Sequence, residues 1–256
     1  MTKTRIKYAV GFVFFVLLFV WAWCFVSFRP ISCEFFPTSP FEFYELTDAA
    51  RGGFSTASMD LSDSLLSVEV NVRSGVAYPA VGVGFNLKSV HNRPVDHFDF
   101  SVYDTLEIVF ATRRMSSVSI RILTDDPAYS KVGLRETFRP VVYNVPASRS
   151  FDTVKVPVNG FKTAVWWLAA MGLEEDDGLT HLHRSTALEI ANGDGILRGI
   201  SDEISVKSLR AWGVSRDFEN VMYAILIVMV VTFVILETVT LKRNPNEPPK
   251  NGGQNV

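Results

Sequence analysis

Cysteine is scarce in this sequence of 256 residues, which contains only Cys24 and Cys33. Cys24 lies inside a long apolar run and Cys33 lies just beyond it. No disulfide framework can therefore stabilise the middle of the chain. The middle is about 170 residues long, which is enough for one hydrophobic core and too short for two comfortable domains.

Net charge is also nearly absent, at −2 at pH 7, and no basic stripe lies outside the flanks of the apolar runs. Nucleic acid is therefore excluded as an expected partner. The sequence has no Walker loop, no dinucleotide fingerprint and no Ser/His/Asp or Cys/His order with supporting context. We therefore expect a protein that is not an enzyme, with no catalytic residues and no cofactor.

Charged residues are missing from two long stretches, residues 8–28 and residues 221–236, and the second continues through Glu237 to Leu241. Each is long enough to cross a hydrocarbon core of ~30 Å as a helix. The sequence predicts two transmembrane helices. The expected organisation is a short N-terminus (1–7), helix one (8–28), a linker (29–48), the main domain (49–216), helix two (218–241) and a disordered tail (242–256).

Basic residues near the two spans indicate their orientation. Lys3, Arg5 and Lys7 precede the first span, and Lys242 and Arg243 follow the second. Basic residues are retained on the cytoplasmic side. Both termini are therefore expected in the cytoplasm, with the main domain outside it. The single charge Arg29, at the other end of the first span, opposes this assignment.

A cleaved secretory signal is the alternative to the first span, and it needs small residues before the cut. Here bulky Trp21, Trp23 and Phe25 stand at that end. A lipoprotein cut before Cys33 is also disfavoured, because Arg29 interrupts the apolar segment that would lead into it. We expect the first span to remain in the protein.

Between the spans, helical periodicity is nearly absent and apolar residues repeat with period two. This alternation is typical of strands with one face on a core. Clusters of Gly, Pro, Asn, Asp and Ser separate the strands. The expected strands lie near residues 66–72, 81–87, 106–110, 118–122, 141–145, 154–158, 187–191 and 204–212.

Eight or so short strands at this spacing predict an antiparallel β-sandwich between two transmembrane α-helices. One short helix is expected from Thr163 to Gly172, with Trp166 and Trp167 in its middle. A long loop that packs its indoles over one end of the sandwich is the alternative.

Short motifs in the middle of the chain resemble those of the galactose-binding-like jelly rolls, a superfamily that includes many carbohydrate-binding modules. They are residues 53–58 (GFSTAS), Ser74-Gly75, Pro79, residues 100–108 (FSVYDTLEI) and Asp202-Glu203-Ile204. The resemblance covers roughly residues 49–213. It implies a jelly-roll fold and sugar binding through aromatic and polar loop residues. Many members also hold a structural calcium ion, which the resemblance leaves open here.

The same fold serves as a membrane-tethered sensory module in bacterial receptors, flanked by two spans. The resemblance therefore implies the inner membrane of a bacterium, a periplasmic domain and a role in signal transduction. The sequence departs from those receptors because it carries no recognisable output domain. Signalling would then need a membrane-protein partner or a homo-oligomer.

Two long connections, residues 124–139 and 163–184, concentrate aromatic and hydrogen-bonding side chains. Long loops in compact domains are commonly functional, and a disordered loop would be poor in aromatics. We expect a cleft between these connections that binds a glycan or small molecule. Packing of the tryptophans in the core or at an interface is the alternative. The candidate ligand-binding residues are Tyr129, Arg135, Phe138, Trp166, Trp167, His181 and His183.

Two further groups could carry chemistry. His181 and His183 would share one face of an extended segment and could bind zinc, but a zinc site needs at least a third ligand at a suitable spacing. The acidic run from Glu174 to Asp177 could bind a cation or serve a hydrolase. A solvated loop is the preferred interpretation of the run, because its spacing does not fit an EF-hand calcium loop, and no metal site is predicted.

The preferred hypothesis is a membrane-tethered recognition or sensory module for an extracytoplasmic ligand, with a carbohydrate as the candidate, or for a partner protein. The alternative is a structural subunit of a cell-envelope complex that binds no small molecule.

Overall fold

The computed structural model of the chain describes residues 3–38, 40–87, 97–174, 177–193 and 196–242. The chain divides into two compact units. One unit contains Met1–Pro30 and Ser215–Val256, and the other is Ile31–Val214. The predicted disordered tail lies outside the described residues, except at its first residue.

The first unit is a pair of helices, α1 (Lys3–Phe28) and α3 (Arg216–Lys242). Within them, Tyr8–Phe28 and Arg216–Val239 are long and apolar enough to cross a membrane, with mean hydropathies of 2.6 and 2.5. The apolar side chains along both helices are largely exposed. Such surfaces are costly in water and favourable in hydrocarbon.

Contacts between the two helices run in opposite sequence directions. They pair Phe14 with Phe233, Trp21 with Met222, Phe25 with Tyr223 and Arg29 with Glu219. Residue numbers rise along one helix as they fall along the other, so the pair is antiparallel. The charge of Arg29, which opposes the expected orientation, is 2.9 Å from the Glu219 carboxylate.

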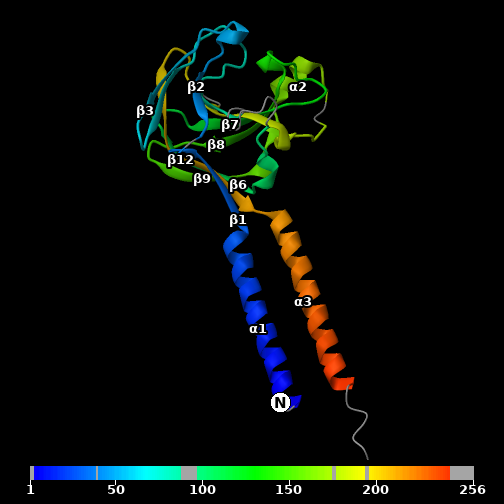
Figure 1. The fold of residues 1–256 in the computed structure, drawn as a ribbon. Helices are drawn as coiled ribbons and strands as arrows, with labels where there is room; N and C mark the ends of the chain where they lie inside the picture. The colour runs from blue at the N-terminus through cyan, green and yellow to red at the C-terminus, as the bar shows by residue number, and fades with distance from the viewer. Residues whose placement is uncertain (1–2, 39, 88–96, 175–176, 194–195, 243–256) are drawn as a thin grey trace, which may run out of the picture. The chain divides into compact units, whose positions relative to one another are not determined.

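The second unit is a β-sandwich, and Figure 1 labels strands of both of its sheets. Among the described residues each sheet has six strands. Sheet A contains β1 (Pro30–Phe36), β3 (Thr56–Leu61), β4 (Leu66–Asn71), β6 (Thr105–Thr112), β9 (Asp152–Pro157) and β12 (Ser201–Val214). Sheet B contains β2 (Glu42–Leu46), β5 (Gly82–Asn86), β7 (Ser117–Thr124), β8 (Arg139–Pro146), β10 (Lys162–Thr163) and β11 (Ser185–Asn192).

The strands run in the order β3-β4-β12-β6-β9 in sheet A, where β1 also pairs with β12, and β10-β8-β7-β11-β5-β2 in sheet B. Every pair whose register is described is antiparallel. The chain crosses repeatedly between the sheets, as in a jelly roll. The predicted antiparallel sandwich, flanked in sequence by two apolar helices, is confirmed.

The core between the sheets is built from the inward half of each alternating strand. Val118, Ile120 and Ile122 of β7 are fully buried against residues such as Leu106 and Ile108 of β6. Burial of each such side chain contributes about 1.5–3 kcal/mol. The predicted short helix is also present, as α2 (Val165–Met171).

Residues 29–48 differ from the expected linker, because they contribute β1 and β2 to the two sheets. Phe35, Phe36 and Phe41 are buried in the main core, and Phe35 stacks on Phe41 and Phe100. The alternation in these strands is short, and the burial of three aromatic rings decides their structure.

Candidate functional site

Sheet B exposes a face away from the core, and three rows of side chains cross it. The register aligns Leu46, Gly82, Ala191, Ser119 and Asn144, then Tyr44, Gly84, Glu189, Arg121 and Val142, then Glu42, Asn86, Ala187, Leu123 and Pro140. Several of these outward side chains are buried, among them Ser119, Leu123 and Glu189. Other segments of the chain must therefore cover parts of this face, which makes the face concave.

Three adjoining depressions form a groove along this face. The first, of about 300 Å³, has Ser119, Arg121 and Trp166 in its lining. The second, of about 100 Å³, shares Arg121 and Trp166 with the first and adds Leu123. The third, of about 290 Å³, shares Leu123 with the second. The groove thus follows β7 from Ser119 to Leu123, roughly 13 Å at ~3.3 Å per strand residue.

The floor of the groove contains a polar cluster of Tyr44, Arg135 and Glu189. Arg135 forms an ion pair with Glu189 and donates to the Tyr44 hydroxyl, and its guanidinium lies 4.5 Å from the Tyr44 ring centroid. Tyr44 donates to Glu189 over 3.1 Å. Burial and then the Glu189 carboxylate raise the pKa of Tyr44. Gly84 leaves space for this ring, because a Cβ there would lie 2.0 Å from Tyr44 Cζ.

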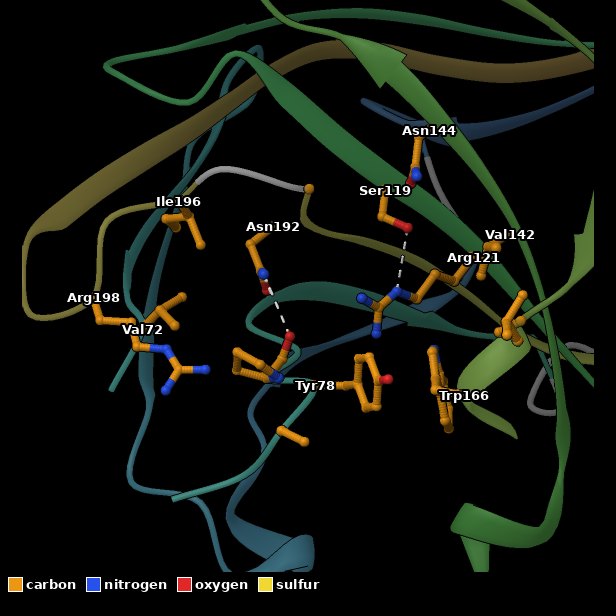
Figure 2. Close-up of a pocket in the computed structure, with 15 residues that line it drawn as sticks. Val72, Tyr78, Ser119, Arg121, Val142, Asn144, Trp166, Asn192, Ile196 and Arg198 are labelled. Carbon is orange, nitrogen blue, oxygen red and sulfur yellow. Dashed lines mark hydrogen bonds between the residues drawn. The ribbon is translucent and has the colours of Figure 1, made fainter. Parts of the chain in front are cut away.

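Arg51, Tyr78 and Trp166, from three distant parts of the sequence, form one rim. Arg51 donates to the Tyr78 carbonyl over 2.9 Å and lies 5.5 Å from the Trp166 ring centroid. Asn192 fixes the segment after Tyr78, because its side chain accepts from Val81 N at 2.8 Å and donates to the Pro79 carbonyl at 3.3 Å. Figure 2 shows Tyr78, Trp166 and Asn192 among the residues that line the pocket.

A second group of aromatic and charged residues lies around the buried guanidinium of Arg139. This side chain is 0% exposed and donates to Asp126 Oδ2 at 2.8 Å and to Asp177 Oδ1 at 2.5 Å. It also donates to the Leu179 carbonyl and lies 5.0 Å from the Trp167 ring centroid. Its guanidinium lowers the pKa of Asp177 to about 2. The Arg139 cluster is thus a compensated structural site.

The structure separates the seven predicted site residues. Arg135, Phe138 and Trp166 line the groove. Tyr129 instead packs edge-on against Trp167, with ring centroids 5.5 Å apart, next to the Arg139 cluster.

His181 lies 3.7 Å from Asp126 of the Arg139 cluster, and His183 is exposed with its ring 6.1 Å from that of His181. The two segments named for the cleft therefore contribute to two different places.

The expectation that both tryptophans face a ligand needs a correction. Trp167 is fully buried, whereas Trp166 is half-buried and lines two depressions. Successive residues of a helix point in directions about 100° apart, so adjacent indoles on α2 cannot share one surface. Trp167 Nε1 is buried and has no hydrogen-bond partner among the described residues.

The acidic run has a structural role at its last residue, because Asp177 binds Arg139. Glu175 and Asp176 lie outside the described residues. Among the residues that the structure describes, no group of three or more His, Cys, Asp or Glu side chains is placed to hold a metal ion.

Several groove residues are not among the seven predicted ones, namely Arg51, Tyr78, Ser119, Arg121, Asn144, Glu189, Asn192 and Arg198. Alternation along β7 is a signal that Ser119 and Arg121 point away from the core. That the opposite face of the sheet is hollowed depends on Arg51, Tyr78 and Trp166 meeting above it, and no local pattern encodes that meeting.

No family model matches the chain, and a search of curated proteins returned no match. Solved structures that resemble it include a family 11 carbohydrate-binding module from Clostridium thermocellum in complex with a mixed-linked tetrasaccharide. That match has a TM-score of 0.45 and 12% identity, and it covers 72% of this chain and 95% of that chain.

A family 30 carbohydrate-binding module is also similar, with a TM-score of 0.41, 12% identity and coverage of 71% of this chain and 98% of that one. These proteins are carbohydrate-binding modules, the group that the sequence motifs resemble.

Proposed function

We propose that the sandwich domain is a recognition module that binds an extended carbohydrate chain in the groove along β7. The observation that carries the proposal is the continuity of the three depressions, which share Arg121 and Trp166 at one junction and Leu123 at the next. A continuous groove accommodates a chain of sugar rings better than a single compact ligand.

The lining of the groove suits sugars. Tyr78 and Trp166 offer aromatic faces, on which the apolar faces of sugar rings pack. Ser119, Asn144 and Asn192 offer donors and acceptors for hydroxyl groups. Ligand sites of this kind combine apolar surface with a small number of placed polar groups.

The acids in the described lining do not favour catalysis. Glu189 is 3% exposed and is held by Arg135 and Tyr44. Glu136 is exposed on the connection before β8. Glycoside hydrolysis needs two carboxyl groups that face each other across the bond to be cleaved. A fixed, ion-paired Glu189 supports binding without turnover.

We further propose that the two helices anchor this domain in a membrane with both termini in the cytoplasm, and that it acts through a membrane-protein partner. Three features support the proposal. They are the two apolar helices, their antiparallel pairing and the basic residues at the helix ends nearest the chain termini. Reporter fusions at the two termini, one type active only inside the cytoplasm and one only outside, test this. An external terminus at either end would overturn the arrangement.

A glycan array probed with the full chain in detergent tests recognition. Trp166→Ala with Asn144→Ala should abolish binding, because a stacking face and a hydrogen-bonding group are lost together. The matched control is Arg113→Gln, which removes half of a surface ion pair with Glu203 on sheet A. Saturable binding that fails in the double variant and survives in the control supports the proposal. A blank array, confirmed by thermal shift, favours the structural-subunit alternative.

A further inference from the structure

The first depression of the groove is lined by two arginines, Arg121 and Arg198. Its cavity of about 300 Å³, here named the arginine pocket, lies where Ser119, Arg121, Asn192 and Arg198 meet. That volume is at the lower end for small-molecule sites, about right for one sugar residue of a longer chain.

The arginine pocket has two cationic and no acidic side chains among its described lining residues. Asp194 lies in the sequence between the lining residues Gly193 and Ile196 and is outside the described residues. The neighbouring second depression differs, because its lining includes Glu136 and Glu189. The second depression also contains three arginines, so the first has the larger excess of cationic over acidic residues in its described lining.

The two guanidinium groups come from different elements and approach the cavity from opposite sides (Figure 2). Arg121 projects from the centre of β7, and its Nε donates to Ser119 Oγ over 3.4 Å. Arg198 belongs to the connection between β11 and β12 and is exposed. No ion pair of Arg198 is found within the described part of the chain.

Guanidinium groups bind carboxylate and sulfate oxygens through paired, charge-assisted hydrogen bonds. Two of them around a cavity of this size, beside Tyr78 and Trp166, are suited to a ring that carries one negative group. Neutral sugars need hydroxyl partners and no such charge.

We propose that the arginine pocket binds an acidic sugar, so that the ligand of the groove is an anionic glycan that carries carboxylate or sulfate groups. This inference rests on the proposed carbohydrate recognition and names the class of carbohydrate. Arg121 and Arg198 hold the acidic group, and the aromatic rings hold the sugar ring that bears it.

The test measures affinity by titration of the full chain in detergent with paired probes. Oligogalacturonate is compared with its neutral methyl ester, and dextran sulfate oligomers with unsulfated dextran. At least one acidic probe should bind about tenfold or more tightly than its neutral counterpart. The pair that shows this difference tells carboxylate from sulfate.

The Arg121→Gln, Arg198→Gln double variant should remove this preference, with Arg113→Gln again as the control. Because Arg198 is exposed, Arg198→Gln alone provides a variant with little risk to folding, and it should lose part of the preference.

Equal binding of the acidic and neutral probes, or unchanged binding by the double variant, would overturn the inference and leave glycan recognition standing. Failure of both acidic probes would overturn it too, while the separate glycan array decides whether the groove recognises carbohydrate at all.

Discussion

Two clusters of arginine and aromatic residues lie in the same domain and differ in how their charge is matched. In the Arg139 cluster the guanidinium is 0% exposed, and Asp126 and Asp177 compensate it. In the arginine pocket, Arg121 and Arg198 face a cavity whose described lining contains no acid. The first arrangement is matched by its own carboxylates, and the second is the one that we propose meets an acidic ligand.

The two tryptophans of α2 show the same division at adjacent positions. Trp167 packs beside Arg139, and Trp166 lines the groove beside Arg51. Composition alone does not tell these roles apart. What separates them is whether the charged groups are buried with partners or placed at an accessible cavity.

Removal of the buried cation should have the largest effect. Arg139→Met leaves Asp126, 3% exposed, without its main cationic partner. We expect a loss of about 3–5 kcal/mol in the free energy of unfolding, or roughly 10 °C in Tm.

The measurement is thermal unfolding followed by near-UV circular dichroism. Arg113→Met, at a surface pair, should cost about 0–1 kcal/mol. Addition of Asp126→Leu to Arg139→Met should recover part of the loss, because less unpaired charge is then buried. Equal effects of the Arg139 and Arg113 substitutions would show that the buried cluster is not structural.

Separate replacement of the two tryptophans of α2 should have the next largest effects. Trp167→Ala should cost about 3–5 kcal/mol of stability through the cavity it leaves. Trp166→Ala should change stability much less and weaken binding of the array-selected glycan by about thirtyfold, as expected of a central aromatic contact. Titration and thermal unfolding of both variants measure these effects. A Trp166 variant that binds like the unmodified protein would remove this residue from the site.

Much of the fold follows from local pattern, because alternation on β7, β8, β11 and β12 decides which side chains reach the core. The helices follow from the absence of charge over each span. The strands in residues 29–48 could not be predicted as readily, since Phe35 and Phe36 acquire their place only when they meet Phe41 and Phe100.

The site was less predictable for a related reason. Composition identified Arg135, Phe138 and Trp166, which do line the groove, and it also selected Trp167, which packs around Arg139. Whether these residues bind a ligand stays a prediction. Tyr78 and Arg198 lie in connections without a distinctive pattern and reach the groove only through the tertiary arrangement.

Acid should weaken the Arg139 cluster through Asp177. The pKa of this carboxyl is about 2 in the folded protein against 3.8 ordinarily, because Arg139 donates to it. The unfolded chain then binds more protons between these values, so stability falls as the pH drops. Asp177→Asn should lower stability above pH 3.8 and differ little from the unmodified protein below pH 2. Denaturant midpoints across this range measure it. A constant difference at every pH would mean that the ion pair contributes nothing.

The smallest expected effect is that of salt, which should weaken ligand binding at the arginine pocket and leave the stability contributed by the Arg139 cluster nearly unchanged. A rise from about 0.1 M to about 1 M NaCl shortens the Debye length from about 10 Å to about 3 Å, which screens accessible charges and leaves buried pairs much less affected. Binding of an acidic probe at Arg121 and Arg198 should therefore weaken several-fold, because salt ions reach this accessible site and screen its charges. The loss in Tm caused by Arg139→Met should stay nearly the same, since that guanidinium is 0% exposed.

Titrations and unfolding curves at both salt concentrations measure the two quantities, with the neutral methyl ester as the matched ligand. If the acidic probe and its ester weaken equally, charge does not distinguish the arginine pocket from the rest of the groove.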